Sequence, residues 1–179
     1  MSAMPLTIIK SDQELHSHDL VALRNLLDFA YEGDFSVNDW LHTIGGVRFV
    51  GKLSGEIVAH GAVVPRDFSI NGQSTRVGYL EGIAISTKLQ GQGLGSQLLT
   101  EISEYCRSNF ELSMLSTDEF NFYGKFGWRQ FQGKSGVIRD GHVTMTPEED
   151  EGLMYLFGKS SPVINIQTAY CDWRPGDVW

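Results

Sequence analysis

Cysteine is scarce in this chain. Its 179 residues include only Cys106 and Cys171, which stand far apart, without a C-x-x-C pair and without histidine at ligand spacing. The pattern therefore indicates neither a disulfide framework nor a cysteine-based zinc site, and both thiols are expected to be buried apolar side chains. No metal is expected.

Long hydrophobic runs and basic clusters are also missing. No apolar stretch approaches membrane-spanning length, and the first residues lack the basic cluster and apolar run of a secretory signal. Lysine and arginine number 14 against 22 aspartate and glutamate, which gives a net charge of −8 and a pI near 5.0. This acidic balance disfavours nucleic acid and membranes as partners and favours a cationic partner. Because no secretory signal is expected, the location is expected to be cytoplasmic.

The composition is otherwise that of a globular protein, with 41% hydrophobic and 20% charged residues. No repeats, linkers or low-complexity tracts interrupt it. A chain of this length can bury a core without metal or disulfide support, so we expect one domain over residues 1–179.

The chain is organised around residues 77–100, where an apolar strand meets a glycine-rich turn and then a helix. Glu81 is the one carboxylate in that strand. Glycines let the backbone approach an anion closely, and the first N–H groups of the helix have no intrahelical partner. We therefore expect a pyrophosphate cradle here, formed by Gln90, Gly91, Gln92, Gly93, Leu94 and Gly95.

Two other glycine motifs do not fit this turn. A Walker A loop requires a lysine that is absent, and a dinucleotide fingerprint requires G-x-G-x-x-G, whereas the glycines fall at 91, 93 and 95. Gln90-x-x-Gly93-x-Gly95 instead resembles the acetyl-CoA signature, [Arg/Gln]-x-x-Gly-x-[Gly/Ala], of the GNAT superfamily of N-acetyltransferases. Taken alone, the pattern also fits an ordinary turn between a strand and a helix.

Hydrophobic periodicity and turn signals outline the other elements. We expect a strand at 6–9, a helix at 20–31, a hairpin of strands 47–53 and 56–64 around Ser54-Gly55, strands 68–70 and 73–85 around Asn71-Gly72, a helix at 95–106, a strand at 110–116, a short helix from 120 closing at Gly127, and edge strands at 136–138 and 152–157.

The loop at residues 31–40 carries three carboxylates among aromatic residues. One interpretation is a lip that binds an amine, with Asp34 and Asp39 as acceptors and aromatic faces for cation–π contact. The other is local: Ser36 caps a short helix and Asp39 completes a capping box. The two interpretations are compatible.

A wider resemblance follows from the order of the motifs. Strand, glycine turn, helix and strand, followed by F-Y-x-x-x-G-W at 122–128, is similar to the core of the GNAT superfamily. Four further stretches resemble the aminoglycoside 2′-N-acetyltransferases over nearly the whole chain: E-G-D-F at 32–35, H-T-x-G-G at 42–46, G-Y-L-E-G at 78–82 and C-D-W-R-x-G-D-x-W at 171–179.

This resemblance implies an α/β (α+β) fold with a mixed, largely antiparallel central sheet, splayed where the pantetheine arm of acetyl-CoA inserts and flanked by helices. It implies acetyl-CoA as co-substrate and a cationic aminoglycoside as acceptor, and relatives are often dimers, so a homodimer is an expectation by analogy. Cofactor contacts are implied for Ile83, Ala84, Ile85 and residues 90–95, and Tyr123 matches the general acid. Acceptor contacts are implied for Asp34, Asp39, Glu81, Gly82, Ser116, Asp150, Glu151, Asp177 and Trp179.

The chemistry of acetyl transfer agrees with these residue types. Acetyl transfer needs a neutral amine and an outlet for a leaving thiolate. Glu81 in an apolar strand is expected to have a raised proton affinity and to act as the base, directly or through water. Tyr123 is expected to protonate the coenzyme A sulfur, and N–H groups beside Ile83 to polarise the thioester. Direct transfer in a ternary complex fits best, because neither cysteine lies in an activating motif.

The predicted function is acetylation of the 2′-amine of an aminoglycoside, which confers antibiotic resistance. The drug is either a deoxystreptamine type, such as gentamicin or tobramycin, or kasugamycin. One alternative is an acetyltransferase of the same fold that acts on another polyamine or amino sugar. A second is a non-catalytic acyl-CoA-binding module, which the presence of Glu81 and Tyr123 disfavours.

Overall fold

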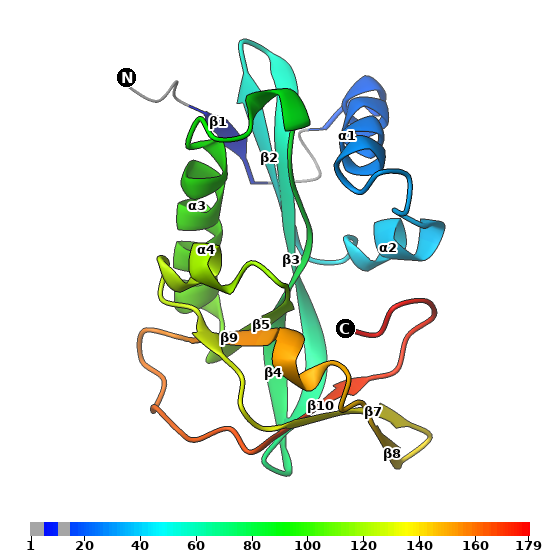
Figure 1. The fold of residues 1–179 in the computed structure, drawn as a ribbon, viewed down its shortest axis with the longest axis vertical. Helices are drawn as coiled ribbons and strands as arrows, with labels where there is room; N and C mark the ends of the chain where they lie inside the picture. The colour runs from blue at the N-terminus through cyan, green and yellow to red at the C-terminus, as the bar shows by residue number, and fades with distance from the viewer. Residues whose placement is uncertain (1–5, 11–14) are drawn as a thin grey trace. The chain divides into compact units, whose positions relative to one another are not determined.

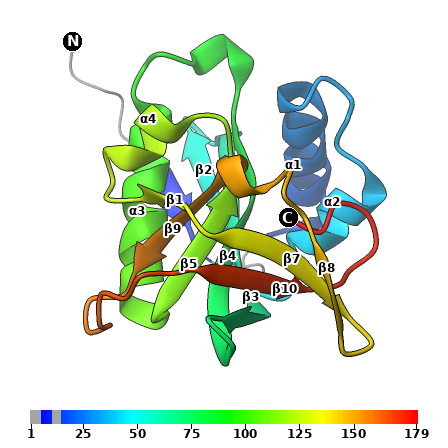
Figure 2. The ribbon, with the colours of Figure 1, turned by 60° about the horizontal axis from the view of Figure 1, so that its bottom comes forward.

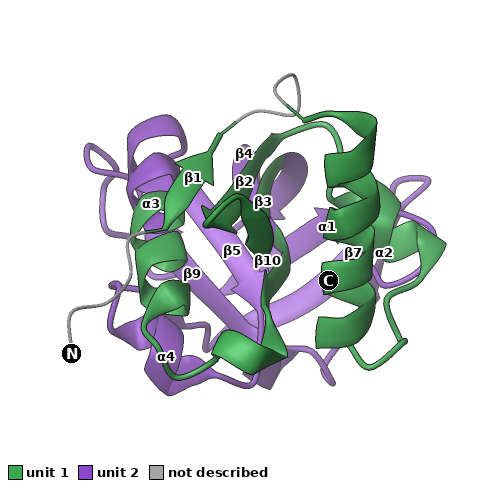
Figure 3. Cartoon of the chain, turned by 90° about the horizontal axis from the view of Figure 1, so that it is seen from above, with its two compact units in different colours: residues 1–64, 81–102 green, residues 65–80, 103–179 purple. Residues whose placement is uncertain are grey.

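The computed structural model of the protein describes residues 6–10 and 15–179. Figure 3 shows its two compact units: unit 1 comprises residues 1–64 and 81–102, and unit 2 comprises residues 65–80 and 103–179. The chain passes between them within β3 (Glu56–Ile70), β4 (Gln73–Ile85) and α3 (Leu94–Asn109), which are labelled in Figure 1. The first five residues, on which the expectation of no secretory signal partly rests, lie outside the described residues.

The strands of unit 1 form the predicted antiparallel hairpin. β2 (Val47–Leu53) pairs with β3 from Val47↔Val63 to Leu53↔Glu56, and β1 (Thr7–Ile9) pairs with the other edge of β2. The predicted turn at Ser54-Gly55 is confirmed, since the two residues lie between the paired strands with positive φ.

Two helices of unit 1 precede this hairpin, as predicted. α1 (Ser17–Ala30) is followed by α2 (Val37–His42), and Ser36 and Asp39 form the predicted capping box of α2 with hydrogen bonds of 2.7 and 3.1 Å. A small core cluster holds the loop between these helices: Leu26, Leu27, Phe35 and Ala84, with Ala30, Trp40 and Ile57 packed against it. Phe35 thereby connects this loop to the end of β4.

The strands of the mixed sheet follow the order β6–β9–β5–β4–β3–β10–β7–β8, and β2 and β1 join it through β3. Its remaining strands are β5 (Leu112–Ser116), β6 (Arg129–Gln130), β7 (Lys134–Arg139), β8 (His142–Met145), β9 (Leu153–Phe157) and β10 (Thr168–Asp172). β4 is parallel to β5 and β10 is parallel to β7, whereas β9 runs antiparallel to β5 (Figure 2). The predicted α/β (α+β) fold, with a mixed sheet and helices, is confirmed.

The parallel pairing of β4 with β5 is short. Its register runs only from Val77↔Leu112 to Tyr79↔Met114, although β4 continues to Ile85. A splayed sheet, as the resemblance implies, requires two strands whose pairing ends before the strands do. The pairing of β4 with β5 meets this requirement, because it ends at Tyr79.

Two predictions about the strands were wrong, and two strands were missed, one of them β8 (His142–Met145). Residues 136–138 and 152–157 lie in β7 and β9, which are inner strands rather than edges, because β8 and β6 pair with their outer sides. The predicted strands 56–64 and 68–70 are one strand, β3. Pro65 interrupts neither pairing register, because pairing with β2 ends at Val63 and pairing with β10 begins at Phe68. A strand at Thr168–Asp172 was not predicted.

Helix boundaries differ from the predictions at both ends, and α1 spans Ser17–Ala30 rather than residues 20–31. α3 extends to Asn109 rather than Cys106. α4 (Phe120–Gly124) ends before Gly127, which has the positive φ expected after a helix but follows a further turn. Two short 3₁₀ helices, η2 (Thr87–Leu89) and η3 (Asp150–Gly152), were not predicted.

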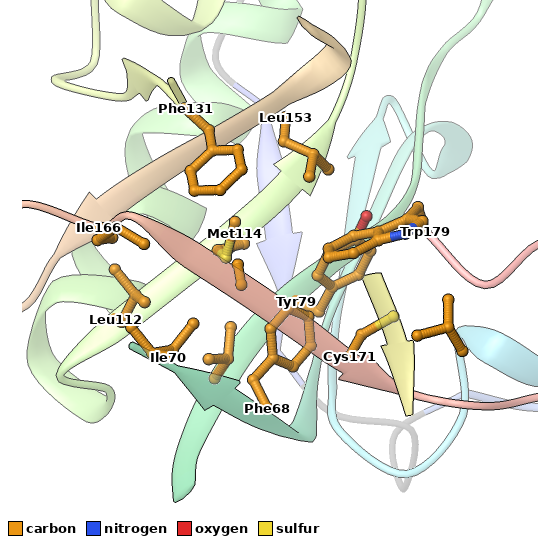
Figure 4. Close-up of a cluster of buried hydrophobic side chains, with 13 residues drawn as sticks. Phe68, Ile70, Tyr79, Leu112, Met114, Phe131, Leu153, Ile166, Cys171 and Trp179 are labelled. Atoms are coloured by element: carbon orange, nitrogen blue, oxygen red, sulfur yellow. The ribbon is translucent and has the colours of Figure 1, made fainter. Parts of the chain in front are cut away.

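The main core of unit 2 gathers side chains from β3, β4, β5, β7, β9 and β10, together with the last residue of the chain (Figure 4). Trp179 packs edge-on against Phe68 with ring centroids 5.6 Å apart. Cys171 belongs to this cluster, and both cysteines are buried and unbonded, as expected.

Among residues 6–10 and 15–179, no helix is long and apolar enough to cross a bilayer. No group of three or more His, Cys, Asp or Glu side chains there is arranged to hold a metal ion.

Candidate active site

The backbone of β4 is irregular next to Glu81. Gly82 has φ of +58°, and a Cβ built on it would lie 3.1 Å from the Thr43 side chain and 3.3 Å from the His60 ring. Both the left-handed conformation and the close neighbours therefore favour glycine. Glu81 itself is half-buried.

A buried histidine holds this irregular position. His60 Nδ1 lies 2.6 Å from the Gly82 carbonyl oxygen, and the ring is fully buried in unit 1. The pKa of His60 is lowered to about 3, mainly by burial and also by the charge of Arg48, although the hydrogen bond to Gly82 acts to raise it. The ring is therefore neutral at pH 7, and Nδ1 donates its proton to the carbonyl.

The next carbonyl of β4, that of Ile83, accepts a hydrogen bond from a residue that follows α1. The Tyr31 hydroxyl donates a hydrogen bond of 3.1 Å to the Ile83 oxygen. The pKa of Tyr31 is raised to about 12, mainly by burial and also by the charges of Glu81 and Asp39. Two consecutive carbonyls beside Glu81 are thus fixed by side chains.

The loop that carries Asp34 is anchored by arginine. Arg24 donates a hydrogen bond of 2.7 Å to the Phe35 carbonyl, and its guanidinium lies over the rings of Phe35 and Trp40. Arg48 lies over the same Trp40 ring at 4.7 Å. The rings of Phe35 and Trp40 therefore contact the protein's own cations rather than standing free for a ligand, and the exposed Asp34 carboxylate remains at the surface.

The cofactor residues implied by the resemblance follow in sequence order. Ala84 is buried, whereas Ile83 and Ile85 are half-buried. Gly91 and Gly93 have positive φ, and residues 90–93 are exposed before Leu94, which is buried, begins α3. An exposed glycine turn at the first N–H groups of an anchored helix fits an anionic pyrophosphate.

Tyr123 lies in unit 2 and is also held by aromatic packing. It is buried in α4, with its ring edge-on to Trp128 at 6.4 Å. The Trp128 indole in turn donates a hydrogen bond of 2.9 Å to Ser103 in α3. The F-Y-x-x-x-G-W motif therefore attaches α4 to the second half of α3.

The C-terminal residues are fixed within unit 2 by one buried arginine and one indole. Arg66 donates hydrogen bonds to the Asp172 carboxylate at 3.0 Å and to the Val178 carbonyl at 2.8 Å. The Trp179 indole donates to the Thr146 hydroxyl at 3.0 Å. Residues 172–179 are thus held by hydrogen bonds within the unit.

The predicted carboxylates of unit 2 differ in their surroundings. Asp150 accepts a hydrogen bond of 2.6 Å from the Ser135 N–H and pairs with Lys134 at 3.2 Å. Burial alone would raise the pKa of Asp150, but these contacts outweigh it and leave the pKa below its ordinary value. Asp177 and Glu151 are exposed, although one Asp177 oxygen accepts a hydrogen bond from the Trp179 N–H.

Glu149 lies directly before η3, next to Asp150. Burial raises its pKa, and the charges of Asp177 and Glu148 raise it further. Ser116 ends β5 and is exposed, and a Cβ on Gly152 would lie 3.4 Å from its hydroxyl oxygen.

The structure thus places the predicted residues in two groups. Unit 1 holds Asp34, Asp39, Glu81, Gly82, Ile83, Ala84, Ile85 and residues 90–95; unit 2 holds Ser116, Tyr123, Asp150, Glu151, Asp177 and Trp179. Sequence analysis missed Tyr31, His60 and Arg66. The only signal for His60 was a polar residue within an apolar run, and Tyr31 stood in the acidic loop already singled out.

Comparison with known proteins identifies the family of the chain. The model of the acetyltransferase (GNAT) family matches residues 14–128. A curated relative from Mycolicibacterium fortuitum, named aminoglycoside 2′-N-acetyltransferase, is 34% identical over 96% of this chain and 93% of its own length.

Solved structures share the fold at low sequence identity. The Escherichia coli GNAT acetyltransferase YhbS, solved with CoA, matches with a TM-score of 0.64 and 16% identity over 96% of this chain and 92% of its own. A GNAT acetyltransferase from Brucella melitensis, solved with acetyl-CoA, matches with a TM-score of 0.62 and 17% identity over 93% and 95%. Two longer solved chains are matched over only 33% and 35% of their length.

The family model covers more than half of the chain, and the curated relative matches it nearly from end to end. The chain therefore belongs to the acetyltransferase (GNAT) family and, within it, to the aminoglycoside 2′-N-acetyltransferase family.

Proposed function

We propose that this acetyltransferase transfers an acetyl group from acetyl-CoA to the 2′-amine of an aminoglycoside and so confers resistance to it. The proposed substrate is supported by the 34% identity, over 96% of the chain, to a relative named for that reaction. Acetyl-CoA as co-substrate is supported by structural neighbours solved with acetyl-CoA or CoA. The cytoplasmic location and the homodimer stay predictions.

Glu81 is the proposed general base. Its backbone is held on the C-terminal side by the His60 and Tyr31 hydrogen bonds to Gly82 and Ile83, which limits the directions available to its side chain. A fixed carboxylate can take a proton from the amine, directly or through water, as nitrogen bonds to the acetyl carbon.

Acetyl-CoA supplies the thioester whose carbon–sulfur bond breaks in this step. Tyr123 is the proposed general acid, and it gives its phenolic proton to the departing sulfur. The proton removed from the amine remains on Glu81 or its water, so protons balance over the transfer. The N–H groups of Ile83 to Ile85 are proposed to face the thioester carbonyl.

Direct transfer is favoured over an acyl-cysteine intermediate. Burial raises the pKa of Cys106 to about 12 and that of Cys171 to about 11, so both are thiols at neutral pH. The thiolate is the nucleophilic form of cysteine. Neither side chain is therefore suited to accept the acetyl group.

The acceptor is proposed to bind through its positive charges. The net charge of −8 and the exposed carboxylates Asp34, Glu151 and Asp177 provide an attractive field for a polycation. We propose that Asp39, Ser116, Asp150 and the Trp179 carboxylate complete the acceptor contacts. Asp39 and Asp150 also have structural partners within the protein, so their contributions to binding are the smaller ones.

The test is thiol release from acetyl-CoA with a panel of four acceptors: a deoxystreptamine drug with a 2′-amine, its 2′-hydroxyl counterpart, kasugamycin and spermine. Turnover of a 2′-amino compound without turnover of the 2′-hydroxyl counterpart is expected. The better of the two drug types identifies the substrate branch. Turnover of spermine alone would indicate a polyamine acetyltransferase instead. If no acceptor is turned over although acetyl-CoA binds, a non-catalytic acyl-CoA-binding protein is favoured.

A further inference from the structure

The hydroxyl of Tyr31 has only one proton, and that proton is already used. It is donated to the Ile83 carbonyl at 3.1 Å, so the phenol oxygen can take part in further hydrogen bonds only as an acceptor. Tyr31 stands just after α1, and its ring packs at 5.0 Å against Phe35, which is buried in the small core of unit 1. The position of the oxygen is thus set from two sides.

The surroundings of this oxygen are negative. Glu81 and Asp39 lie close enough for their charges to act on the phenol, and together with burial they keep it protonated, with the pKa at about 12. An acceptor oxygen in the negative field of two carboxylates prefers a donor that carries positive charge. Tyr31 is nevertheless 39% exposed, so a ligand has access to it.

We propose that Tyr31 recognises the acceptor: its phenol oxygen accepts a hydrogen bond from an amino group of the cationic substrate, beside the proposed base Glu81. This inference rests on the proposed function and adds to it a specificity-determining residue. The hydrogen bond to Ile83 fixes which way the oxygen lone pairs point. The reacting amine, or an ammonium group next to it, then meets an acceptor already oriented before it arrives.

A purely structural role for Tyr31 makes a different prediction. If the hydroxyl only supported the Ile83 backbone, its loss would disturb the stretch proposed to bind the pantetheine arm. Affinity for acetyl-CoA and thermal stability would then fall, while affinity for the acceptor would stay the same. The two roles are therefore separated by which ligand loses affinity.

The experiment is the Tyr31→Phe variant, which keeps the ring against Phe35 and removes only the hydroxyl. The KM for a 2′-amino aminoglycoside is expected to rise about tenfold or more, as for a lost hydrogen bond to a charged group. The KM for acetyl-CoA is expected to change less than about twofold, and the melting temperature to fall only by the small amount expected for one exposed hydrogen bond to a backbone carbonyl. Calorimetric titration of the drug into the protein without acetyl-CoA should show the same loss of affinity. Tyr170→Phe, which removes a phenol hydroxyl from β10 of unit 2, is the matched control and should change neither KM.

Three results would overturn the inference. If the wild-type protein acetylates the drug and Tyr31→Phe binds it with unchanged affinity, the inference is wrong and the proposed function is unaffected. A loss confined to acetyl-CoA affinity or to melting temperature assigns Tyr31 the structural role. A wild-type protein that neither binds nor acetylates any 2′-amino drug removes both the inference and the proposed function.

Discussion

The Nδ1 atom of His60 lies 2.6 Å from the carbonyl oxygen of Gly82, and it makes this contact from a fully buried ring. Gly82 needs its positive φ to bring that carbonyl toward β3, and Glu81 precedes it directly. Nε2 of the same ring has no hydrogen-bond partner among the described residues. The ring therefore has to stay neutral, since a proton on Nε2 would be a buried charge without an acceptor.

This requirement makes His60 a source of acid sensitivity. The pKa is about 3 in the folded protein against an ordinary value of 6.5, so the unfolded chain binds the proton first as pH falls. The contribution of His60 to stability is complete above pH 6.5 and is lost progressively between pH 6.5 and about 3. At about 1.4 kcal/mol per pKa unit, the loss amounts to a few kcal/mol.

The measurement is the free energy of unfolding of wild type and His60→Gln between pH 4 and 8. We expect the variant to be less stable at pH 7 but to lose less stability on acidification. The control is His142→Gln at an exposed histidine of β8, which should follow the wild-type curve. Parallel curves for wild type and His60→Gln would show that this histidine does not titrate on unfolding.

Removing the two proposed catalytic groups should reduce turnover without unfolding the protein. Glu81→Gln and Tyr123→Phe keep the size of each side chain, and kcat with the best acceptor should fall about 100-fold or more in each. Steady-state kinetics with melting temperatures checks this, with Glu56→Gln at the exposed start of β3 as control. Wild-type kcat in both variants would refute the mechanism while leaving the fold unaffected.

Two arginine–aspartate pairs in unit 2 should differ sharply in their contribution to stability. Arg66 is buried, binds Asp172 and the Val178 carbonyl, and lies 5.0 Å from the Tyr79 ring centroid. We expect Arg66→Ala to cost about 2–4 kcal/mol of unfolding free energy, because buried carbonyls and packing are left without a partner.

The second pair is the matched control. Arg76 and Asp67 are 2.7 Å apart with side chains 60% and 72% exposed, so Arg76→Ala should cost less than about 1 kcal/mol. Urea unfolding of both variants measures the difference. Equal losses would mean that the hydrogen bonds of Arg66 to the C-terminal residues contribute little.

The carboxylates Asp177 and Asp150 should separate acceptor binding from stability. Asp177→Asn is expected to weaken aminoglycoside binding several-fold and to leave acetyl-CoA binding unchanged, because the side chain is exposed and carries charge. Asp150→Asn is expected to act mainly on stability, since Asp150 is held by Ser135 and Lys134. The pKa of Asp150 is lowered on folding, so its contribution is present at neutral pH and disappears as pH falls below about 3.8.

Calorimetric titrations with each ligand, together with melting curves at pH 7, test this pair of variants. Equal losses of drug and acetyl-CoA affinity in Asp177→Asn would argue against an acidic acceptor site. An Asp150→Asn variant with wild-type stability would show that its contacts with β7 are dispensable.

Several features of the fold could be predicted from the sequence because short segments specify them. The hairpin turns at Ser54-Gly55 and Asn71-Gly72 depend on residues that accept positive φ, and the capping box of α2 depends on a serine and an aspartate three positions apart. The same holds for the glycine turn before α3. Each of these signals lies within a few residues of the structure that it produces.

Strand order could not be predicted in this way. Whether β7 and β9 lie inside the sheet or at its edge depends on β8 and β6, and β10 pairs with β3 across about a hundred residues of chain. A run of apolar residues predicts a strand but does not identify its neighbours. The edge assignments were wrong for this reason.

The sequence by itself determined the family, the glycine turn, and the identity of Glu81 and Tyr123 as candidates. Tertiary structure alone decided what holds those residues: His60 reaches Gly82 over 22 positions, Tyr31 reaches Ile83 over 52, and Arg66 reaches Asp172 over 106. It also decided that Trp40 lies under two arginines and that Asp150 is engaged with β7. Hydrogen bonds between residues so far apart depend on how the whole chain packs, and no local pattern encodes them.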